Sequence, residues 1–280
     1  TTMLLGAAKY LANNQDFRGQ VNFIFQPAEE GIGGAKAMIE DGLFEQFPCD
    51  TLYAMHNAPK MKIGALAAIA GVRTAAGAFF DIDITGKGAH GAMPDQGVDP
   101  VIIAGELIVA LQSIVSRNIN PGQTAVLSIT QVHAGDAYNV IPGSARLSGT
   151  VRTLDMKLMA RIETRVREMV SGICAAHGAT GIVDYRIIFH TVQNDATVSA
   201  FAADVCDELV GKENVYREGN PGTGSEDFSF MSEQVPSCYL NLGNGKDSHS
   251  LHNHDYDFND EALSYGASFF ARVVEKSLTE

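Results

Sequence analysis

The stretch AFFDIDITGKGAHGAMPDQGVDPVIIAGELIVALQSIVSR, residues 78–117, contains the pattern that decides the fold of this chain. Phe80, Ile82 and Ile84 alternate with polar side chains, which predicts a half-buried strand over 78–85. After a Gly-rich loop, apolar residues recur at helical spacing, which predicts a helix over 98–117. A strand followed by an amphipathic helix indicates a sheet with that helix packed on one face.

The same alternation of patterns continues towards the C-terminus. The residues predict strands over 124–132 and 144–153, a long helix over 157–177 and a further strand over 181–189. The resulting order is β-α-β-β-α-β. It is the order of a split βαβ, ferredoxin-like unit, in which both helices cover one face of an antiparallel sheet.

Helices and strands also alternate on both sides of this unit. The predicted elements are helices 2–13, 35–47, 195–210 and 260–277 and strands 21–25, 51–56 and 238–242. Such alternation favours a parallel-type sheet flanked by helices. The fold class is therefore α/β, with one domain formed by 1–74 and 191–280 and an inserted α+β domain at 75–190.

The composition excludes several classes of protein. The chain has 280 residues, of which 45% are hydrophobic and 19% charged, a balance typical of globular proteins. Its net charge is -13, from 20 basic and 33 acidic residues, without a polybasic block. Nucleic acid and anionic membranes favour clustered Lys and Arg, so neither is expected as a partner. We find no apolar run of the roughly 18 residues that a membrane span needs.

The four cysteines indicate an intracellular protein. Cys49, Cys174, Cys206 and Cys238 form no C-x-x-C pair, and their spacing suggests no disulfide framework. Buried free thiols in a reducing compartment are the expectation, and the chain begins without a visible signal peptide. The predicted location is the cytoplasm.

Two adjacent acids follow the first predicted strand. Glu29 and Glu30 lie between Pro27 and Gly31, directly after the strand expected at 21–25. In an open parallel sheet, ligands bind beyond the carboxyl ends of the strands. One carboxylate there can bind a metal ion while its neighbour takes a proton from a water molecule. The alternative is a solvated acidic turn.

Histidines lie at two further points of the same domain. His56 closes the strand predicted at 51–56, and residues 248–255 read SHSLHNHD, with three histidines in six positions. Imidazole and carboxylate together suit Zn²⁺, Mn²⁺ or a similar divalent ion. The alternatives are a hydrogen-bonded edge residue for His56 and a polar surface loop for the cluster.

Two Gly-rich segments complete the set of candidate motifs. Residues 86–94 place His90 in a loop at a strand end, where it can donate a hydrogen bond to a developing oxyanion. The segment lacks the full G-x-G-x-x-G pattern and the Lys-Ser/Thr pair of a phosphate loop. Residues 222–228 predict the start of a helix, with Ser225 as a candidate N-cap.

Together these stretches resemble the M20 metallopeptidase family, in particular its aminoacylase and hippurate hydrolase-like amidohydrolase branch. The matching pieces occur in family order and span nearly the whole chain. They are Gln26–Glu30, Met55–Asn57, Gly86–Pro94, Asn139–Pro142, Gly149–Arg152, Gly224–Phe228 and Leu251–His252. The resemblance implies that the domain formed by 1–74 and 191–280 is catalytic and that the inserted domain mediates dimerisation.

The resemblance also implies roles for individual residues. Glu29 corresponds to the general base of the family. Glu30, His56 and His252 correspond to metal ligands. His90 corresponds to a histidine that reaches the active site of the partner subunit and polarises the scissile carbonyl.

Two further residues correspond to groups that hold the substrate near its carboxylate. These are Asn139 and Arg152. An arginine suits this task because its planar guanidinium binds a carboxylate through two hydrogen bonds.

The sequence departs from the family pattern at its start. The branch has a Cys-Gly-His-Asp-Gly-His segment immediately before the residues that match Thr1–Thr2, and its Cys and first His would complete a two-metal site. We therefore expect an N-terminally truncated chain with three of five ligands. The implied cofactors of the complete protein are two divalent ions per subunit, zinc or manganese, with cobalt or nickel also suited to the donors. A smaller departure is Asn253–His254, where the branch often has Ser-Pro.

The function implied by the resemblance is metal-dependent hydrolysis of the amide bond of N-acyl amino acids. The substrate is a small molecule, and the expected assembly is a homodimer through 75–190. Two alternatives remain open from the sequence: a dipeptidase or aminopeptidase on the same scaffold, and an inactive fragment that dimerises.

Overall fold

The computed structural model describes residues 1–30 and 33–279. The chain folds into two compact units. The first unit comprises Thr1–Arg73, Val192–Gly222 and Glu226–Glu280, and the second comprises Thr74–Thr191 and Thr223–Ser225.

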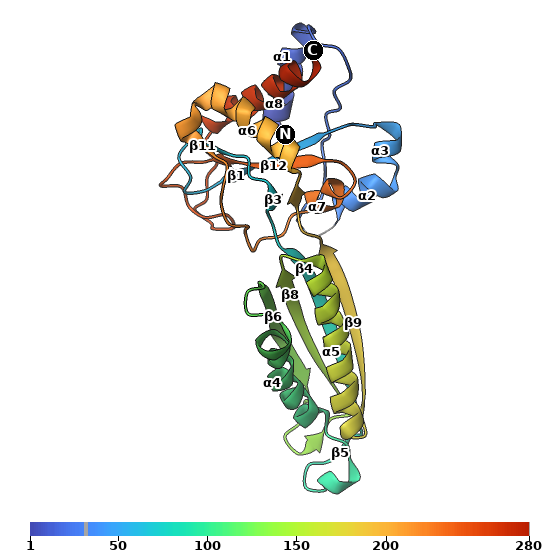
Figure 1. Ribbon diagram of the computed structural model, residues 1–280. Coiled ribbons are helices and arrows are strands. Elements are labelled where there is room, and N and C mark those ends of the chain that lie inside the picture. Colours follow the sequence, from blue (N-terminus) through green and yellow to red (C-terminus); the bar gives the residue numbers. More distant parts are fainter. Residues whose placement is uncertain (31–32, 280) are drawn as a thin grey trace. The chain divides into compact units, whose positions relative to one another are not determined.

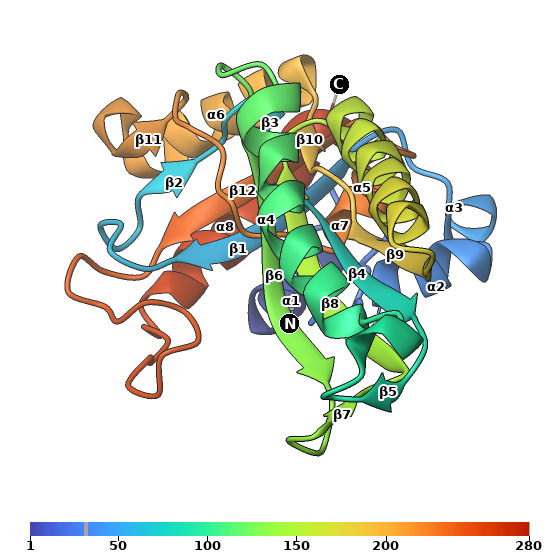
Figure 2. The ribbon, with the colours of Figure 1, turned by 90° about the horizontal axis from the view of Figure 1, so that it is seen from below.

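The second unit has a four-stranded antiparallel sheet covered by two long helices. The strands are β4 (Ala76–Thr85), β6 (Ala125–Ala134), β8 (Ser144–Thr153) and β9 (Thr180–Phe189), in the order β6-β8-β4-β9. The helices α4 (Pro100–Asn118) and α5 (Met156–Ala176) lie on one face of this sheet (Figures 1 and 2). The predicted β-α-β-β-α-β order is present, and the α/β fold class is confirmed.

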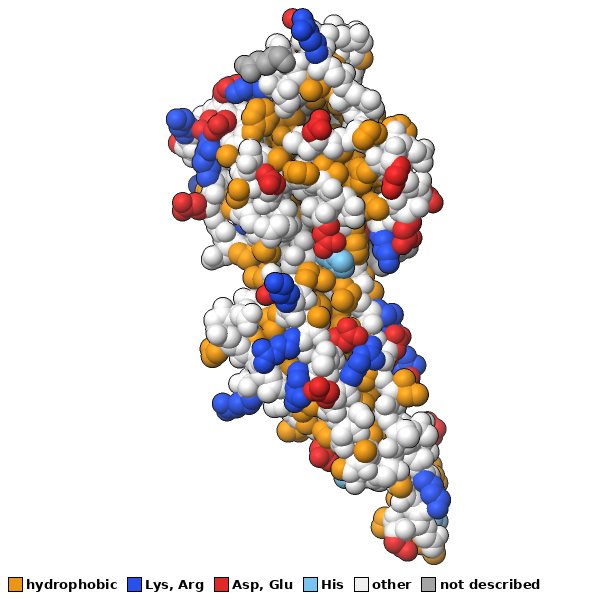
Figure 3. Space-filling view, turned by 45° about the vertical axis from the view of Figure 1, so that its right-hand side comes forward, with side chains coloured by type: hydrophobic (Ala, Val, Ile, Leu, Met, Phe, Trp, Pro, Cys, Tyr) orange, Lys and Arg blue, Asp and Glu red, His pale blue; other side chains and the backbone are white. Residues whose placement is uncertain are grey.

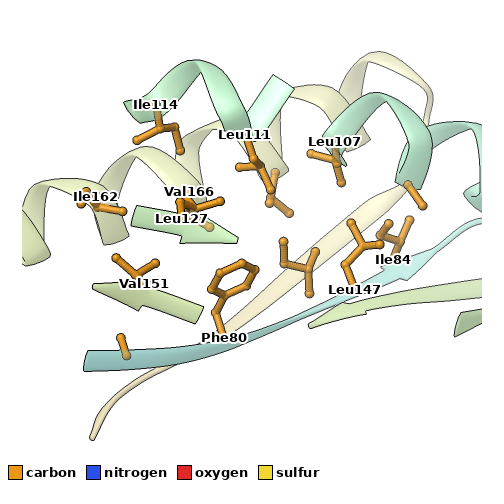
Figure 4. Packing of buried hydrophobic residues seen from close by; sticks show 14 of the residues in the cluster. Phe80, Ile84, Leu107, Leu111, Ile114, Leu127, Leu147, Val151, Ile162 and Val166 are labelled. Atoms are coloured by element: carbon orange, nitrogen blue, oxygen red, sulfur yellow. The ribbon is translucent and has the colours of Figure 1, made fainter. Parts of the chain in front are cut away.

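The core of the second unit is formed by the apolar stripe of each helix and the inward face of the sheet (Figure 4). Phe80 from β4 lies against Tyr185 from β9, with stacked rings whose centroids are 6.3 Å apart. Side chains of Asp99 and Asp155 accept hydrogen bonds from the first turns of α4 and α5, which fixes where both helices begin. Both helices begin within two residues of their predicted first residues.

Three short elements extend the second unit beyond the paired strands β4 and β8. Strands β5 (Ala89–His90) and β7 (Val140–Ile141) form an antiparallel pair, and the 3-10 helix η1 (Pro94–Gln96) follows β5. The sequence predicted loops at these places. The pairing connects two segments that are about 50 residues apart in the chain.

The first unit contains a smaller mixed sheet. Strands β1 (Leu52–Ala58) and β12 (Ser237–Gly243) pair in parallel, and β2 (Leu66–Ala67) and β11 (Val215–Tyr216) complete the order β1-β12-β2-β11. A second ladder joins β3 (Gly71–Val72) to β10 (Gln193–Asn194). The expected parallel-type sheet is therefore present, although the pair between β12 and β2 is antiparallel.

Helices pack around this sheet. They are α1 (Thr2–Asn13), α2 (Gly34–Glu40), α3 (Leu43–Gln46), α6 (Ala196–Val210), α7 (Phe228–Ser232) and α8 (Ala262–Leu278), with a 3-10 turn η2 (Lys212–Asn214). The first and last helices lie side by side, because α1 packs on α8 (Figure 1). Gly266 permits this approach, since a Cβ at that position would lie 2.1 Å from the sulfur of Met3.

Two sequence predictions for the first unit are wrong. Residues 21–25 form no strand, and Phe25 is 45% exposed. A strand needs a neighbour for its backbone groups, and no described strand pairs with this run; the Asn22 side chain instead donates to the carbonyls of Phe47 and Pro48.

The helix predicted over 35–47 is interrupted. It ends as α2 at Glu40 and resumes as α3 at Leu43, because Gly42 adopts the left-handed conformation with φ 86°. The glycine at this position is the residue type that most often ends a helix in this way.

Helix α4 requires a correction to the hydropathy reading. Residues Pro100–Asn118 are long and apolar enough to cross a membrane by length and composition alone. The helix nevertheless buries Ile103, Leu107, Leu111 and Ile114 against the sheet of the second unit. Its hydropathy is thus accounted for by one core-facing stripe plus exposed apolar residues such as Ile102 and Val109.

Candidate functional site

The parallel strands β1 and β12 end at the same edge of the first unit's sheet, from Leu52 opposite Ser237 to Ala58 opposite Gly243. His56 lies near this end of β1. Its Nδ1 lies 2.8 Å from the carbonyl oxygen of Asn57. A carbonyl only accepts hydrogen bonds, so in the neutral form of the ring Nδ1 carries the proton and Nε2 has the lone pair. This is the tautomer that a metal-binding histidine needs.

Glu29 lies in a turn and is partly buried. Burial raises the pKa of its carboxyl group, and the neighbouring charges of Glu226 and Glu30 raise it further. A hydrogen bond from the Asp227 backbone N–H and the charge of His56 lower the pKa. The structure thus brings Glu29, Glu30 and His56 together. A carboxylate with a raised pKa is a stronger general base.

Glu226 is a member of this group that the sequence analysis missed. Its side chain is buried and accepts hydrogen bonds from the Tyr239 hydroxyl at 2.9 Å and from the Phe228 N–H at 3.3 Å. The Tyr239 ring in turn lies 6.3 Å from the His56 ring. Burial, followed by the charge of Glu226, raises the pKa of Tyr239, so this hydroxyl remains a donor.

Asp227 also belongs to the site and corrects one prediction. Helix α7 begins at Phe228 with Asp227 as its N-cap residue, so Ser225 does not cap it. The Asp227 carboxylate instead accepts hydrogen bonds from Gln26 and Ala35, on either side of the Glu29–Glu30 turn. The sequence contained one signal for this role, since two adjacent acids precede an apolar helix. Acidic side chains at such a position are rarely buried unless they have partners.

His252 lies at the same edge of the sheet but is held less closely. The loop that carries it is joined to the end of β1 by hydrogen bonds between Asn57 and Tyr256 and between Lys60 and Ser248. His252 itself is exposed and has a left-handed backbone, with φ 60°. Such a conformation is unfavourable for a residue other than Gly and often occurs at functional positions.

The candidate ligands are chemical groups that bind divalent metals, but too few of them lie together among the described residues to form a site. Carboxylate oxygen from Glu30 and imidazole nitrogen from His56 and His252 are ligands of zinc and manganese. Within residues 1–30 and 33–279, however, no group of three or more His, Cys, Asp or Glu is arranged to hold an ion. The three predicted ligands therefore do not form a complete site in this structure.

In the second unit the structure brings His90 and Asn139 together. The β5–β7 ladder pairs His90 with Val140, and the Asn139 carbonyl accepts a hydrogen bond from Gly91 at 2.7 Å. Both side chains are exposed. His90 Nδ1 accepts the Ala92 N–H at 3.1 Å, which places the proton of the neutral ring on Nε2. Nε2–H is a donor that can stabilise an oxyanion.

Arg152 lies in β8 with its guanidinium half-buried. The group donates to Thr150 and to the Val151 carbonyl and lies over the Phe79 ring, 5.7 Å from its centroid. Burial lowers its pKa, and no ion pair joins it to an acidic residue in the described part of the chain. Gly77, its partner in the register, leaves space over the strand, since a Cβ there would lie 3.1 Å from Nη1.

The two candidate substrate-binding residues lie at opposite ends of the same sheet. Arg152 pairs with Gly77 near one end of β4, whereas Asn139 and His90 lie beyond Thr85 at the other. Most of the length of β4 separates these ends, roughly 25 Å at the usual rise of a strand. One copy of this unit therefore cannot present Arg152 and His90 to the same small substrate.

Comparison with known proteins identifies the family. The model of peptidase family M20/M25/M40 matches residues 1–276. The chain belongs to this family. The predicted family and the predicted enzyme class, a hydrolase that acts on amides, are confirmed.

Three relatives illustrate the relationship. The chain is 41% identical to the hippurate hydrolase of Campylobacter jejuni, over 99% of this chain and 72% of that protein. It is 35% identical to an N-acetylcysteine deacetylase of Bacillus subtilis, over 98% and 71%.

The third relative is a solved structure. It is a Bacillus subtilis protein described as a dinuclear metal binding peptidase from the M20 family, with 31% identity, a TM-score of 0.81, and coverage of 99% of this chain and 70% of that one. The α/β architecture of the chain is therefore that of the family.

Proposed function

We propose that this chain is the greater part of an amidohydrolase that cleaves N-acyl amino acids into a carboxylate and a free amino acid. The observation that carries the proposal is the group formed by Glu29, Glu30 and His56, in which burial and nearby acids raise the pKa of Glu29. Relatives that cleave hippurate and N-acetylcysteine support this substrate class. The cytoplasm is the proposed location, in keeping with four free thiols.

Glu29 acts as the general base in this proposal. It accepts a proton from the attacking water and passes that proton to the nitrogen of the leaving amine, so the carboxylate is regenerated in each turnover. Glu226 keeps the proton affinity of Glu29 high, while the Asp227 N–H orients its carboxylate. Glu30, His56 and His252 would contribute part of the ligand set for divalent ions, zinc or manganese, which would supply Lewis acidity at the scissile carbonyl.

We further propose a homodimer formed through the second unit. Helix α4 exposes Ile102 and Val109, at 61% and 75%, and the neighbouring edge strand β6 exposes Val126 and Val132. An unpaired strand edge beside exposed apolar side chains favours association with another copy. The separation of His90 from Arg152 supports the same assembly, because His90 could then serve the site of the partner subunit.

Replacing Glu29 tests the function directly. In the full-length protein, Glu29→Gln should lower kcat for N-benzoylglycine and N-acetyl amino acids by about 10³-fold, because the amide cannot take the proton. Metal content measured by atomic emission should stay unchanged, since Glu29 is not a ligand. Glu40→Gln, an exposed acid paired with Lys36, is the matched control and should keep full activity. Turnover that survives Glu29→Gln would refute the base assignment, and cleavage of dipeptides alone would refute the substrate class.

Replacing Arg152 tests the substrate carboxylate. Arg152→Lys removes the bidentate geometry, so kcat/KM for N-benzoylglycine should fall about 10- to 100-fold. N-benzoylglycinamide, which has no carboxylate, should be cleaved equally by both proteins. Arg186→Lys serves as the control, because Arg186 lies in the same sheet but is paired with Asp81. Equal losses on the acid and the amide would exclude a carboxylate contact.

A further inference from the structure

One buried carboxylate closes both ends of the segment that carries Glu29 and Glu30. Asp227 is completely buried, and its Oδ2 accepts two hydrogen bonds. The Gln26 side-chain Nε2 and the Ala35 backbone N–H are the donors, each at 2.8 Å. These two donors flank the acids, with one before and the other after them.

The backbone confirms that the two ends of this segment meet. A Cβ at Gly34 would lie 1.8 Å from the Pro27 carbonyl oxygen, so only glycine allows the approach. Ala28, directly before Glu29, has φ 56°. A left-handed residue other than Gly costs free energy and persists where surrounding contacts hold it.

Asp227 also contacts the centre of the segment. Its backbone N–H also acts on the Glu29 carboxylate and lowers the pKa of that group. The same residue therefore fixes the ends of the segment through its side chain and favours the charged form of Glu29 through its backbone. Glu226, the preceding residue, is held by Tyr239 from β12, which ties this corner to the sheet.

We propose that Asp227 is a positioning residue for the general base: its hydrogen bonds to Gln26 and Ala35 hold Glu29 where it can take the proton of the attacking water. The proposal rests on the proposed function. Asp227 touches neither substrate nor metal in this role, and the hydrogen bonds matter rather than its charge. A base displaced by about 1 Å can lose roughly 10²-fold in rate.

Substitution of Asp227 separates these effects. In the full-length protein, Asp227→Ala should lower kcat about 100-fold with KM changed less than about threefold. Asp227→Asn keeps one oxygen that can accept from both donors, so it should recover kcat to within about fivefold of wild type. Asp207→Ala is the matched control, since Asp207 is a largely buried acid of the same unit that pairs with Arg217. It should lower thermal stability without lowering kcat.

A second measurement does not depend on catalysis. Hydrogen exchange followed by mass spectrometry should show at least about tenfold faster exchange at the Ala35 amide in Asp227→Ala, and near-normal exchange in Asp227→Asn. Gln26→Met leaves Asp227 in place and should lower kcat about tenfold, so the proposal remains testable if Asp227→Ala fails to fold. The double variant should be no worse than Asp227→Ala alone, because both changes break one contact network.

Several results would overturn the proposal. A kcat for Asp227→Ala within about twofold of wild type would show a purely structural role, and an Asp227→Asn as inactive as Asp227→Ala would show that charge decides. A wild-type protein inactive on every N-acyl amino acid would refute the proposed function instead. In that case the exchange of Ala35 would still report whether Asp227 holds the segment.

Discussion

The two units of this chain are built in different ways. In the second unit each of the strands β4, β6, β8 and β9 has ten residues, and one continuous core lies between them and the two helices. In the first unit the strands have two to seven residues, and the acids of the candidate site lie in turns. Regular elements thus stabilise one unit, whereas single hydrogen bonds accepted by buried acids fix the functional turns of the other.

The two units also differ in where their charged side chains lie and in what those side chains contact. Figure 3 shows acidic and basic side chains interspersed on one face of the second unit. In the sheet of this unit Asp81 pairs with Arg146 and Arg186. In the first unit Glu226 and Asp227 are buried with neutral hydrogen-bond donors. Substitutions should therefore change stability most in the second unit and catalysis most in the first.

The largest stability effect is expected in the core of the second unit. Phe80 is buried, and Phe80→Ala should lower the free energy of unfolding by about 3–5 kcal/mol, because it leaves a cavity beneath both helices. Native-state hydrogen exchange of the β8 amides measures the free energy of unfolding of the second unit separately from that of the first. Ile182→Thr, at a 70% exposed position of β9, should change it by less than about 0.5 kcal/mol. Equal effects at both positions would contradict a core-stabilised unit.

A smaller effect is expected from one methyl group in the first unit. Gly34→Ala places a Cβ against the Pro27 carbonyl, so we expect a loss of about 2 kcal/mol and displacement of the Glu29–Glu30 turn. Gly172→Ala in the C-terminal part of α5 is the matched change in the second unit, where an added Cβ meets no atom within 4 Å. It should increase stability by about 0.5–1 kcal/mol. Thermal unfolding followed by circular dichroism compares the stability of the two variants. A change of stability in the same direction for both would contradict the contrast between the units.

The same contrast explains which features the sequence could predict. Strands such as 78–85 and helices such as 157–177 are specified by patterns within themselves, and each lies within two residues of its predicted bounds. The run at 21–25 has the composition of a strand, but strand formation also needs a paired neighbour, which a local pattern does not report.

The site shows the same limit. Glu29, Glu30 and His56 were predicted from motifs, and in the structure the charges of Glu30 and His56 act on Glu29; their roles stay predictions. The contribution of Glu226 and Asp227 was missed, because it depends on contacts across some 200 residues of sequence, such as that between Gln26 and Asp227. The distance between Asn139 and Arg152 likewise follows from strand register, which motif spacing does not report.

The smallest effect concerns the dependence of stability on pH. Hydrogen bonds from Ser148 and then Arg186 lower the pKa of Asp81 from 3.8 to about 2. A carboxyl group whose pKa is lower in the folded state contributes stability above its unfolded pKa, and this contribution is lost as pH falls from about 4 through 2. Asp81→Asn should therefore lower the free energy of unfolding by about 1 kcal/mol at pH 7 and by almost nothing near pH 2. The effect at pH 7 is small because solvent screens the ion pairs with the exposed arginines.

The ionisation of Asp227 in the first unit should change stability with pH in the opposite direction. Burial raises its pKa, so its ionisation opposes folding, and that penalty disappears as pH falls below its unfolded pKa.

Hydrogen exchange measured at pH 7 and pH 3 tests the effect of Asp81. It should show β4 opening more readily in acid in the wild type, with a smaller change in Asp81→Asn. If Asp81→Asn left the pH dependence of β4 unchanged, the ion pairs of Asp81 would not stabilise the sheet. The contrast between a unit stabilised by paired surface charges and a unit with buried acids at its functional turn would then have to be abandoned.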